Sequence, residues 1–294
     1  MSSIFWSLPA WLAPDRIQTA WWGLDPVTPP VDEPVTIQDV KEHARIFIGA
    51  DDSYIASLIS AARLRVEKDS NRALLPQTWD FWLQAWPMDR IFIPRAPLIS
   101  VAYLNFTDIT ETVTAVDTSV YDVCTTGDPG SIVKRFGQIW PPGPLSPSRP
   151  INARFQAGYK YFSGTVTVGS DGKSTTWTTG DNFDTTWTRL SRITLDGISY
   201  PIASIADNEH LTLAVAATPG AEVSYTFNMV PEPAKIAIKM LAAHWYASPQ
   251  PIVVGRGIAS VEIQRTYDDL IDSLPRINPM GLNQIRATGS PIWI

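Results

Sequence analysis

The chain has 294 residues, 45% of them apolar, and a formal net charge of −6 from 23 basic and 29 acidic side chains. This length and composition predict a folded protein with a substantial core, built as one elaborated domain or as two. The excess of acidic over basic side chains argues against a protein that binds nucleic acid tightly, because tight binding needs basic side chains that displace counterions from the phosphates. A surface past which DNA merely moves is compatible with this charge.

The cysteine count and the first residues predict where the protein is made. Cys124 is the one cysteine in the sequence, which excludes an internal disulfide and fits a reducing compartment. Residues 1–15 have no basic region and no long apolar run, so we expect no signal peptide. No stretch approaches the roughly 20 apolar residues that a membrane-spanning helix needs. We therefore expect synthesis in the cytoplasm and no membrane partner.

Residues 1–34 are predicted to form an extended arm. Prolines at the density found here forbid a long helix and remove the donors of a strand ladder. The same segment carries five large aromatic side chains, which must lie against the protein's own core or against a neighbour. The whole chain has 12 tryptophans, a number that indicates either a Trp-rich core or assembly contacts.

Two helices are predicted after the arm. Thr36 and Asp39 fit a capping box, and the helix that they begin is expected to end near Gly49. The second helix starts at the Asp51–Asp52 pair and stops at Asn71. Its buried face follows the helical period, and its other face is polar. The apolar positions are Ile55, Leu58, Ile59, Ala62 and Val66, and the polar ones include Ser60, Arg63 and Glu67.

Short strands with turn-rich connections follow, which predicts an antiparallel sheet. The first strand, around Trp79–Ala85, has large apolar groups on both faces. The others are expected near residues 91–93, 98–106, 113–123, 131–136 and 151–159.

Residues 163–228 are predicted to form a small all-β module, barrel-like or sandwich-like. The composition changes there to Thr, Ser, Gly and Asp, with turns at Asp171-Gly172 and Asp196-Gly197. The module is inserted, because helical sequence resumes at residue 231. That helix is apolar on most sides and belongs at the centre of the fold. One more helix, from Ile263 to Leu274, precedes a tail without any period.

The predicted fold class is α+β: a small helical bundle packed with an antiparallel sheet, plus the inserted module. We expect an arm at 1–34, a core at 35–162 and 229–274, the insertion at 163–228 and a docking tail at 275–294.

A search for catalytic chemistry finds little. The three histidines are far apart and no metal-ligand spacing occurs. Asp171-Gly172-Lys173-Ser174 resembles the end of a phosphate-binding loop, but Thr167 occupies the position of that loop's first glycine, so a hairpin turn is the better interpretation. Carboxylate pairs such as Asp51/Asp52 are explained by helix-start charge. We expect no catalytic residue, no metal, no cofactor and no enzymatic activity.

The order of several segments resembles the head–tail connector, or adaptor, proteins of long-tailed bacteriophages and gene transfer agents. The resemblance covers residues 35–162 and 229–274; the insertion between Tyr159 and Val230 and the Tyr246–Pro249 ending depart from the family pattern. The matching segments are VTIQDVKEHARI, DDSYIASLISAARLRVEKDSNRALLPQTWDFWL, IFIPRAPLISVAYLNF, YDV, ARFQAGY and VPEPAKIAIKMLAAHWYASP.

The resemblance implies a structural protein of the virion neck at the capsid vertex. It implies a homo-oligomeric ring, typically of twelve copies, that lies below the portal protein, joins a downstream neck or tail-completion protein and lets double-stranded DNA pass through its channel. The C-terminal tail would engage the portal through Ile285, Arg286, Pro291, Ile292, Trp293 and Ile294. Candidate subunit-interface residues are Trp6, Trp11, Trp21, Trp22, Trp82 and Trp86, and candidate channel-facing residues are Ser60, Arg63 and Glu67.

The insertion leaves two interpretations open. In the first, it faces outward and contacts capsid, neck or decoration proteins. In the second, the protein is a decoration or attachment protein, and the insertion binds carbohydrate by stacking sugars on Trp177 and Trp187. The competing explanation for those two rings is that they fill the core of the small module.

Overall fold

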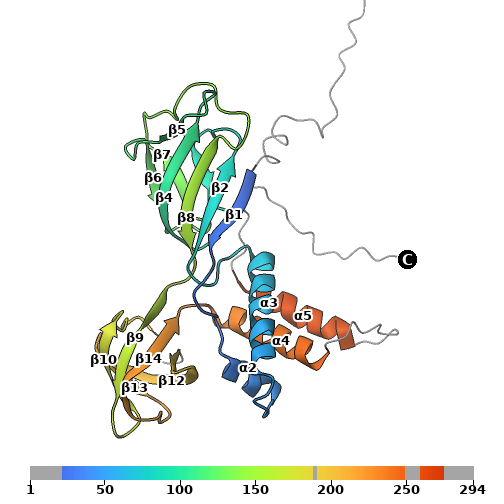
Figure 1. The fold of residues 1–294 in the computed structure, drawn as a ribbon, viewed down its shortest axis with the longest axis vertical. Helices are drawn as coiled ribbons and strands as arrows, with labels where there is room; N and C mark the ends of the chain where they lie inside the picture. The colour runs from blue at the N-terminus through green and yellow to red at the C-terminus, as the bar shows by residue number, and fades with distance from the viewer. Residues whose placement is uncertain (1–21, 188–190, 249–258, 275–294) are drawn as a thin grey trace, which may run out of the picture. The chain divides into compact units, whose positions relative to one another are not determined.

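The structure is a computed structural model that describes residues 22–187, 191–248 and 259–274 (Figure 1). The described residues form two compact units. The first comprises residues 22–29 and 77–158, and the second comprises residues 30–76 and 159–274 apart from the gaps just given. Antiparallel sheets, helices and a closed barrel confirm the predicted α+β class. The predicted core at 35–162 and 229–274 is divided between these units.

The first unit consists of two antiparallel sheets. Its larger sheet has the order β1-β2-β8-β4-β5, with the bounds Trp22–Thr28, Gln77–Leu83, Ile151–Ala157, Leu98–Thr107 and Val113–Ala115. The smaller sheet has the order β3-β7-β6, with the bounds Arg90–Phe92, Ser131–Lys134 and Tyr121–Cys124. β1 contains Pro26, which an edge strand tolerates because one side of its ladder is free. Within the predicted arm, Trp22–Thr28 are extended, because they form β1.

The four described helices belong to the second unit: α2 (Ile37–Ala44), α3 (Asp52–Ser70), α4 (Glu232–Ala247) and α5 (Ala259–Asp272). Both hydrogen bonds of the predicted capping box begin α2. This helix ends at Ala44 and not near Gly49, because Arg45 adopts a left-handed conformation with φ of 55° and closes the last turn. Asn71 ends α3 in the same conformation, as predicted.

The helical core is built around α4, which packs against α2, α3 and α5. The face that α4 buries is made largely of small side chains, which lets the neighbouring helices approach closely. α3 contributes the predicted apolar face, with Leu58 only partly buried. The fully buried members of these two faces are Ile55, Ile59, Ala62, Val66, Ala234, Ala237, Ile238 and Ala242.

The insertion is a closed six-stranded barrel with the order β10-β13-β12-β11-β14-β9. The strand bounds are Tyr161–Val168 (β9), Ser174–Gly180 (β10), Arg192–Leu195 (β11), Ile198–Ile205 (β12), His210–Leu213 (β13) and Gly220–Asn228 (β14). Closure requires β9 to approach β10 closely: a Cβ at Gly164 would overlap the carbonyl oxygen of Thr179. The first and last barrel residues, Tyr161 and Asn228, are paired.

No helix among the described residues has the length and apolar character that crossing a membrane requires.

Candidate functional site

The segment Pro30–Val35, which we call the strap, connects to both the barrel and the helices. On the barrel side, Tyr161 donates its hydroxyl to the Asp32 carboxylate over 3.0 Å, and the Asn228 side-chain amide donates to the Pro34 carbonyl over 3.2 Å. Burial, together with the nearby Asp32 charge, raises the pKa of Tyr161 well above its usual range, so this phenol keeps its proton as a donor. The strap is therefore tied to the first and last strands of the barrel.

On the helical side, the strap supplies a carboxylate to a buried charge network on α3. Glu33 accepts hydrogen bonds from Ser60 Oγ at 2.7 Å and from Arg63 Nε at 2.8 Å. Arg63 also donates Nη1 to Glu67 at 3.0 Å, and the Leu74 backbone N–H donates to Glu67 at 2.9 Å. The side chains of Arg63 and Glu67 are only 9% and 6% exposed. An arginine so placed satisfies two carboxylates at once, which a lysine would do poorly.

These contacts correct the prediction that Ser60, Arg63 and Glu67 lie on a solvent-facing or channel-facing side of α3. Arg63 and Glu67 are buried and Ser60 is half-buried, because the strap covers this side of the helix. The i,i+4 spacing of Arg63 and Glu67 is visible in the sequence, but Glu33 is 30 residues away and no local pattern connects it to them.

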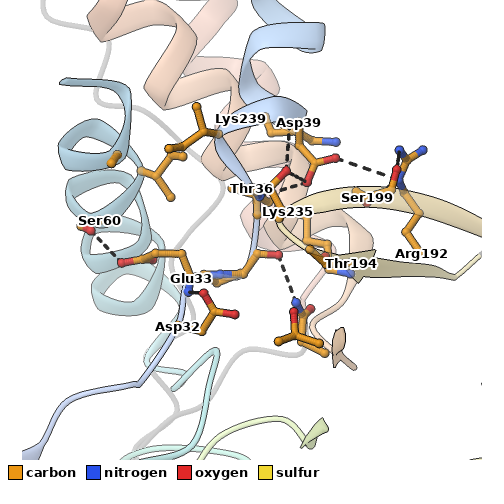
Figure 2. A pocket seen from close by; sticks show the side chains of 18 of the residues that line it. Asp32, Glu33, Thr36, Asp39, Ser60, Arg192, Thr194, Ser199, Lys235 and Lys239 are labelled. Atoms are coloured by element: carbon orange, nitrogen blue, oxygen red, sulfur yellow. Dashed lines mark hydrogen bonds and ion pairs between the residues drawn. The ribbon is translucent and has the colours of Figure 1, made fainter. Parts of the chain in front are cut away.

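A cavity of about 490 Å³ lies beside the strap, between α2, α3, α4 and the barrel strands β11, β12 and β14 (Figure 2). Its lining mixes both signs of charge: Asp32, Glu33, Asp39 and Glu232 oppose Arg192, Lys235 and Lys239.

Most of the carboxylates in this cavity are already engaged. Asp39 caps α2 by accepting from the Thr36 backbone N–H at 3.0 Å, and it lies 3.9 Å from Arg192 Nε. Glu232 forms an ion pair with Lys235 at 3.2 Å. The lining includes neither histidine nor cysteine, and its two serine hydroxyls are engaged as well: Ser60 donates to Glu33, and Ser199 accepts from Arg192 Nε at 2.8 Å. The arrangement suits structural ion pairing and polar contacts.

Among the described residues, no group of three or more His, Cys, Asp or Glu side chains is positioned to hold a metal ion.

The predicted interface tryptophans that fall in the described range lie in the first unit. Trp22 is 38% exposed and packs near Phe81. Trp82 is half-buried, donates its indole N–H to Asp25 at 3.0 Å, and lies under the Arg149 guanidinium. Trp82 is thus already packed within this chain.

Trp86 is also half-buried, and it stacks on Trp140 with ring centroids 4.9 Å apart and planes 6° apart. The interface role of all these tryptophans stays a prediction. The other interface candidates, Trp6, Trp11 and Trp21, lie outside the described residues. So do the tail residues Ile285, Arg286, Pro291, Ile292, Trp293 and Ile294.

The two barrel tryptophans, Trp177 and Trp187, contribute to the core of the barrel. Trp187 is 5% exposed and stacks on Phe227 with centroids 3.7 Å apart, and Phe162 meets its ring edge-on. Trp177 is half-buried and packs against the same core. Neither ring stands free as a flat platform for a sugar.

The fold and the site together define a class of protein. It is an α+β protein whose helical unit carries an inserted closed barrel, and a charge network joins its strap to α3. No protein-family model and no curated protein matches the sequence. Among solved structures, the fold is similar to a chain in the virion of the native gene transfer agent particle, with a TM-score of 0.51 and 16% identity over 87% of this chain and 96% of that chain.

Two further similar chains come from gene transfer agent necks. One is in the neck of the empty particle computed with C6 symmetry, at a TM-score of 0.48 and 18% identity; the other is in the neck of the native particle computed with C12 symmetry, at 0.47 and 17%. Each match covers 83% of this chain and 94% of the other. At 16% identity, the likeness to the virion chain establishes a shared fold.

Proposed function

We propose that this protein is a non-enzymatic structural component of a virion neck that acts as a head–tail connector. The observation that carries the proposal is the fold shared with the gene transfer agent virion chain, because the similarity spans 96% of that chain and 87% of this one. A match of this extent includes both compact units and leaves little of the virion chain unaccounted for. The protein is made in the host cytoplasm and acts in the assembled particle.

Two features of the sequence support this function. The segments that resemble connector proteins occur in the family's order on both sides of the barrel, although each segment alone is short. The net charge of −6 suits a protein that DNA passes without being held, because a basic lining would retain it.

We propose that the protein works as a homo-oligomeric ring, expected to contain twelve copies, between the portal and a downstream neck or tail-completion protein. Residues 275–294 join it to the portal. The part of α3 that is available to a DNA channel or to a neighbouring subunit is the face that the strap leaves exposed, with Ser57, Ala61, Leu64, Arg65 and Lys68.

A mass measurement on the purified full chain, with and without its portal, tests the connector function. We expect a large closed assembly when the portal is present. A monomer under both conditions would contradict the proposal. A variant that lacks residues 275–294 separates the role of the tail from the role of the fold: it should keep the circular-dichroism spectrum of the full chain and lose portal binding. Normal binding by this variant would reject the tail's role alone.

The barrel is proposed to face outward and to contact capsid, neck or decoration proteins. Acidic side chains outnumber basic ones in residues 161–228, which favours a basic partner surface over DNA. A virion assembled with a variant that lacks residues 161–228 should have an altered protein composition. Unchanged composition and assembly would reject this role.

The alternative function, carbohydrate attachment through the barrel, has weaker support because Trp187 is buried in the barrel core. Glycan-array binding by the full chain that is lost in Trp177→Ala would reverse this ranking. Tyr200→Ala is a matched control, since Tyr200 is another partly buried aromatic residue packed against the barrel core.

A further inference from the structure

Several loops of the first unit emerge at one end of the five-stranded sheet. In the β2–β8 pairing Leu83 lies opposite Ile151, and in the β4–β8 pairing Ile151 lies opposite Phe106. The C-terminal ends of β2 and β4 and the N-terminal end of β8 are therefore neighbours. The loops that continue from these strands are residues 84–89, 108–112 and 135–150.

This end of the sheet, which we call the apolar tip, exposes large apolar side chains. Phe136 is fully exposed and Met88 is 88% exposed, and both lie close to Lys134, which donates its ammonium to the Met88 carbonyl at 2.8 Å. The exposed apolar side chains in these loops and at the start of β5 and just after β7 include Met88, Ile109, Val113, Phe136 and Ile139. A gathering of this kind is uncommon on an isolated soluble protein and indicates a binding surface.

The apolar tip rests on a rigid aromatic base. Trp86 stacks on Trp140, and Phe106 meets Trp86 edge-on with centroids 6.3 Å apart. The indole N–H groups of both tryptophans are shielded from solvent and have no acceptor among the described residues. The loops are also fixed to one another, since Gln84 donates to the Pro147 carbonyl at 2.7 Å. A surface with such a base is preorganised for an apolar ligand.

The chain itself places a candidate ligand beside the apolar tip. β1 pairs with β2 so that Trp22 lies opposite Leu83, and β1 therefore begins at this same end of the sheet. β4 is three strands away from β1, a distance of about 15 Å at the usual strand spacing. An extended segment of 21 residues spans up to about 70 Å. Residues 1–21 are also rich in large apolar side chains, namely Ile4, Phe5, Trp6, Leu8, Trp11, Leu12, Ile17 and Trp21.

We propose that residues 1–21 bind the apolar tip of their own sheet unit. Attachment at Trp22 gives the arm a high local concentration at this surface, which a free partner lacks. This proposal does not depend on the connector function.

Hydrogen exchange of the full chain, read by mass spectrometry at a concentration where the protein is monomeric, tests the proposal. Backbone amides in residues 1–21 should be protected. The double variant Phe136→Ser/Ile139→Ser should accelerate their exchange about tenfold or more, because the binding surface loses its apolar side chains. Phe47→Ser/Ile48→Ser is the matched control: Phe47 and Ile48 are similarly exposed but belong to the second unit, and the exchange of the arm should not change.

Unprotected arm amides in the unmodified chain would overturn the proposal, as would protection that the tip substitutions leave intact. Chemical cross-linking of a mixture of isotope-labelled and unlabelled chains identifies the occupant. Links between the arm and the apolar tip within one chain support the proposal. Links only between different chains would overturn it in favour of a second copy as the occupant.

Discussion

Replacing Arg63 by methionine should strongly destabilise the second unit. Methionine keeps much of the length and apolar volume of arginine but removes the cation that Glu33 and Glu67 share. Glu67 would then lose the Arg63 cation in a site where its side chain is 6% exposed. Glu33, at 28% exposure, would regain part of its hydration, so most of the penalty falls on Glu67.

Removal of one partner from a buried ion pair costs roughly 3–5 kcal/mol, because the remaining charge stays buried without compensation. In a folded unit of roughly 150–250 residues, each kcal/mol lowers the melting temperature by about 2–4 °C, so the expected decrease is about 6–20 °C.

Differential scanning calorimetry of the full chain at neutral pH measures this effect. Arg65→Met is the matched control on the same helix: Arg65 is 54% exposed and pairs with Asp69 at 2.6 Å, an interaction that contributes only about 0–1 kcal/mol at a surface. Equal melting temperatures for Arg63→Met and Arg65→Met would refute the reasoning.

Three further predictions concern single positions. Trp187→Ala should cost about 3–5 kcal/mol in the barrel, because it empties the space between Phe162, Phe183 and Phe227; denaturant unfolding followed by circular dichroism would show it, and a loss below about 1 kcal/mol would contradict the core role. Thr36→Ala should cost about 1 kcal/mol by removing the cap of α2, whereas Thr36→Ser should cost little, and equal effects in the same assay would count against the cap. Hydrogen bonds from Ser174 and Lys173 lower the pKa of Asp171 from 3.8 to about 2, so its stabilising contribution is complete above about pH 4 and is lost as the pH falls toward 2; Asp171→Asn should flatten the dependence of melting temperature on pH in that window, and an unchanged dependence would show that the turn does not contribute.

Local signals in the sequence predict much of this fold. The hydroxyl and carboxylate of Thr36 and Asp39 locate the start of α2, and Asn71 locates the end of α3. In the barrel, the predicted turn at Asp196-Gly197 supplies two residues with positive φ, as a tight hairpin turn requires, and it separates β11 from β12. Signals of this kind act within four or five residues, so no knowledge of the rest of the chain is needed.

Contacts between distant segments account for what the sequence does not predict. Arg63 and Glu67 look like a solvated helix face until Glu33 and the strap cover them. Closure of the barrel depends on the pairing of β9 with β14, which are the first and last strands of the insertion along the chain. β1 forms a strand despite Pro26 because it lies at the sheet edge, and its partner β2 is some fifty residues further along the chain. The cavity in Figure 2 likewise combines side chains from the strap, three helices and the barrel.

The two ends of the barrel leave it as neighbours, since Tyr161 pairs with Asn228 and the Met229 N–H donates to the Lys160 carbonyl at 3.0 Å. A position with this geometry is a natural grafting point: any domain whose own ends lie close together can be exchanged there without redirecting the chain on either side. The rest of the second unit could therefore carry a different inserted domain at the same junction. In the laboratory, the same junction is the place to introduce a fluorescent protein or an affinity domain.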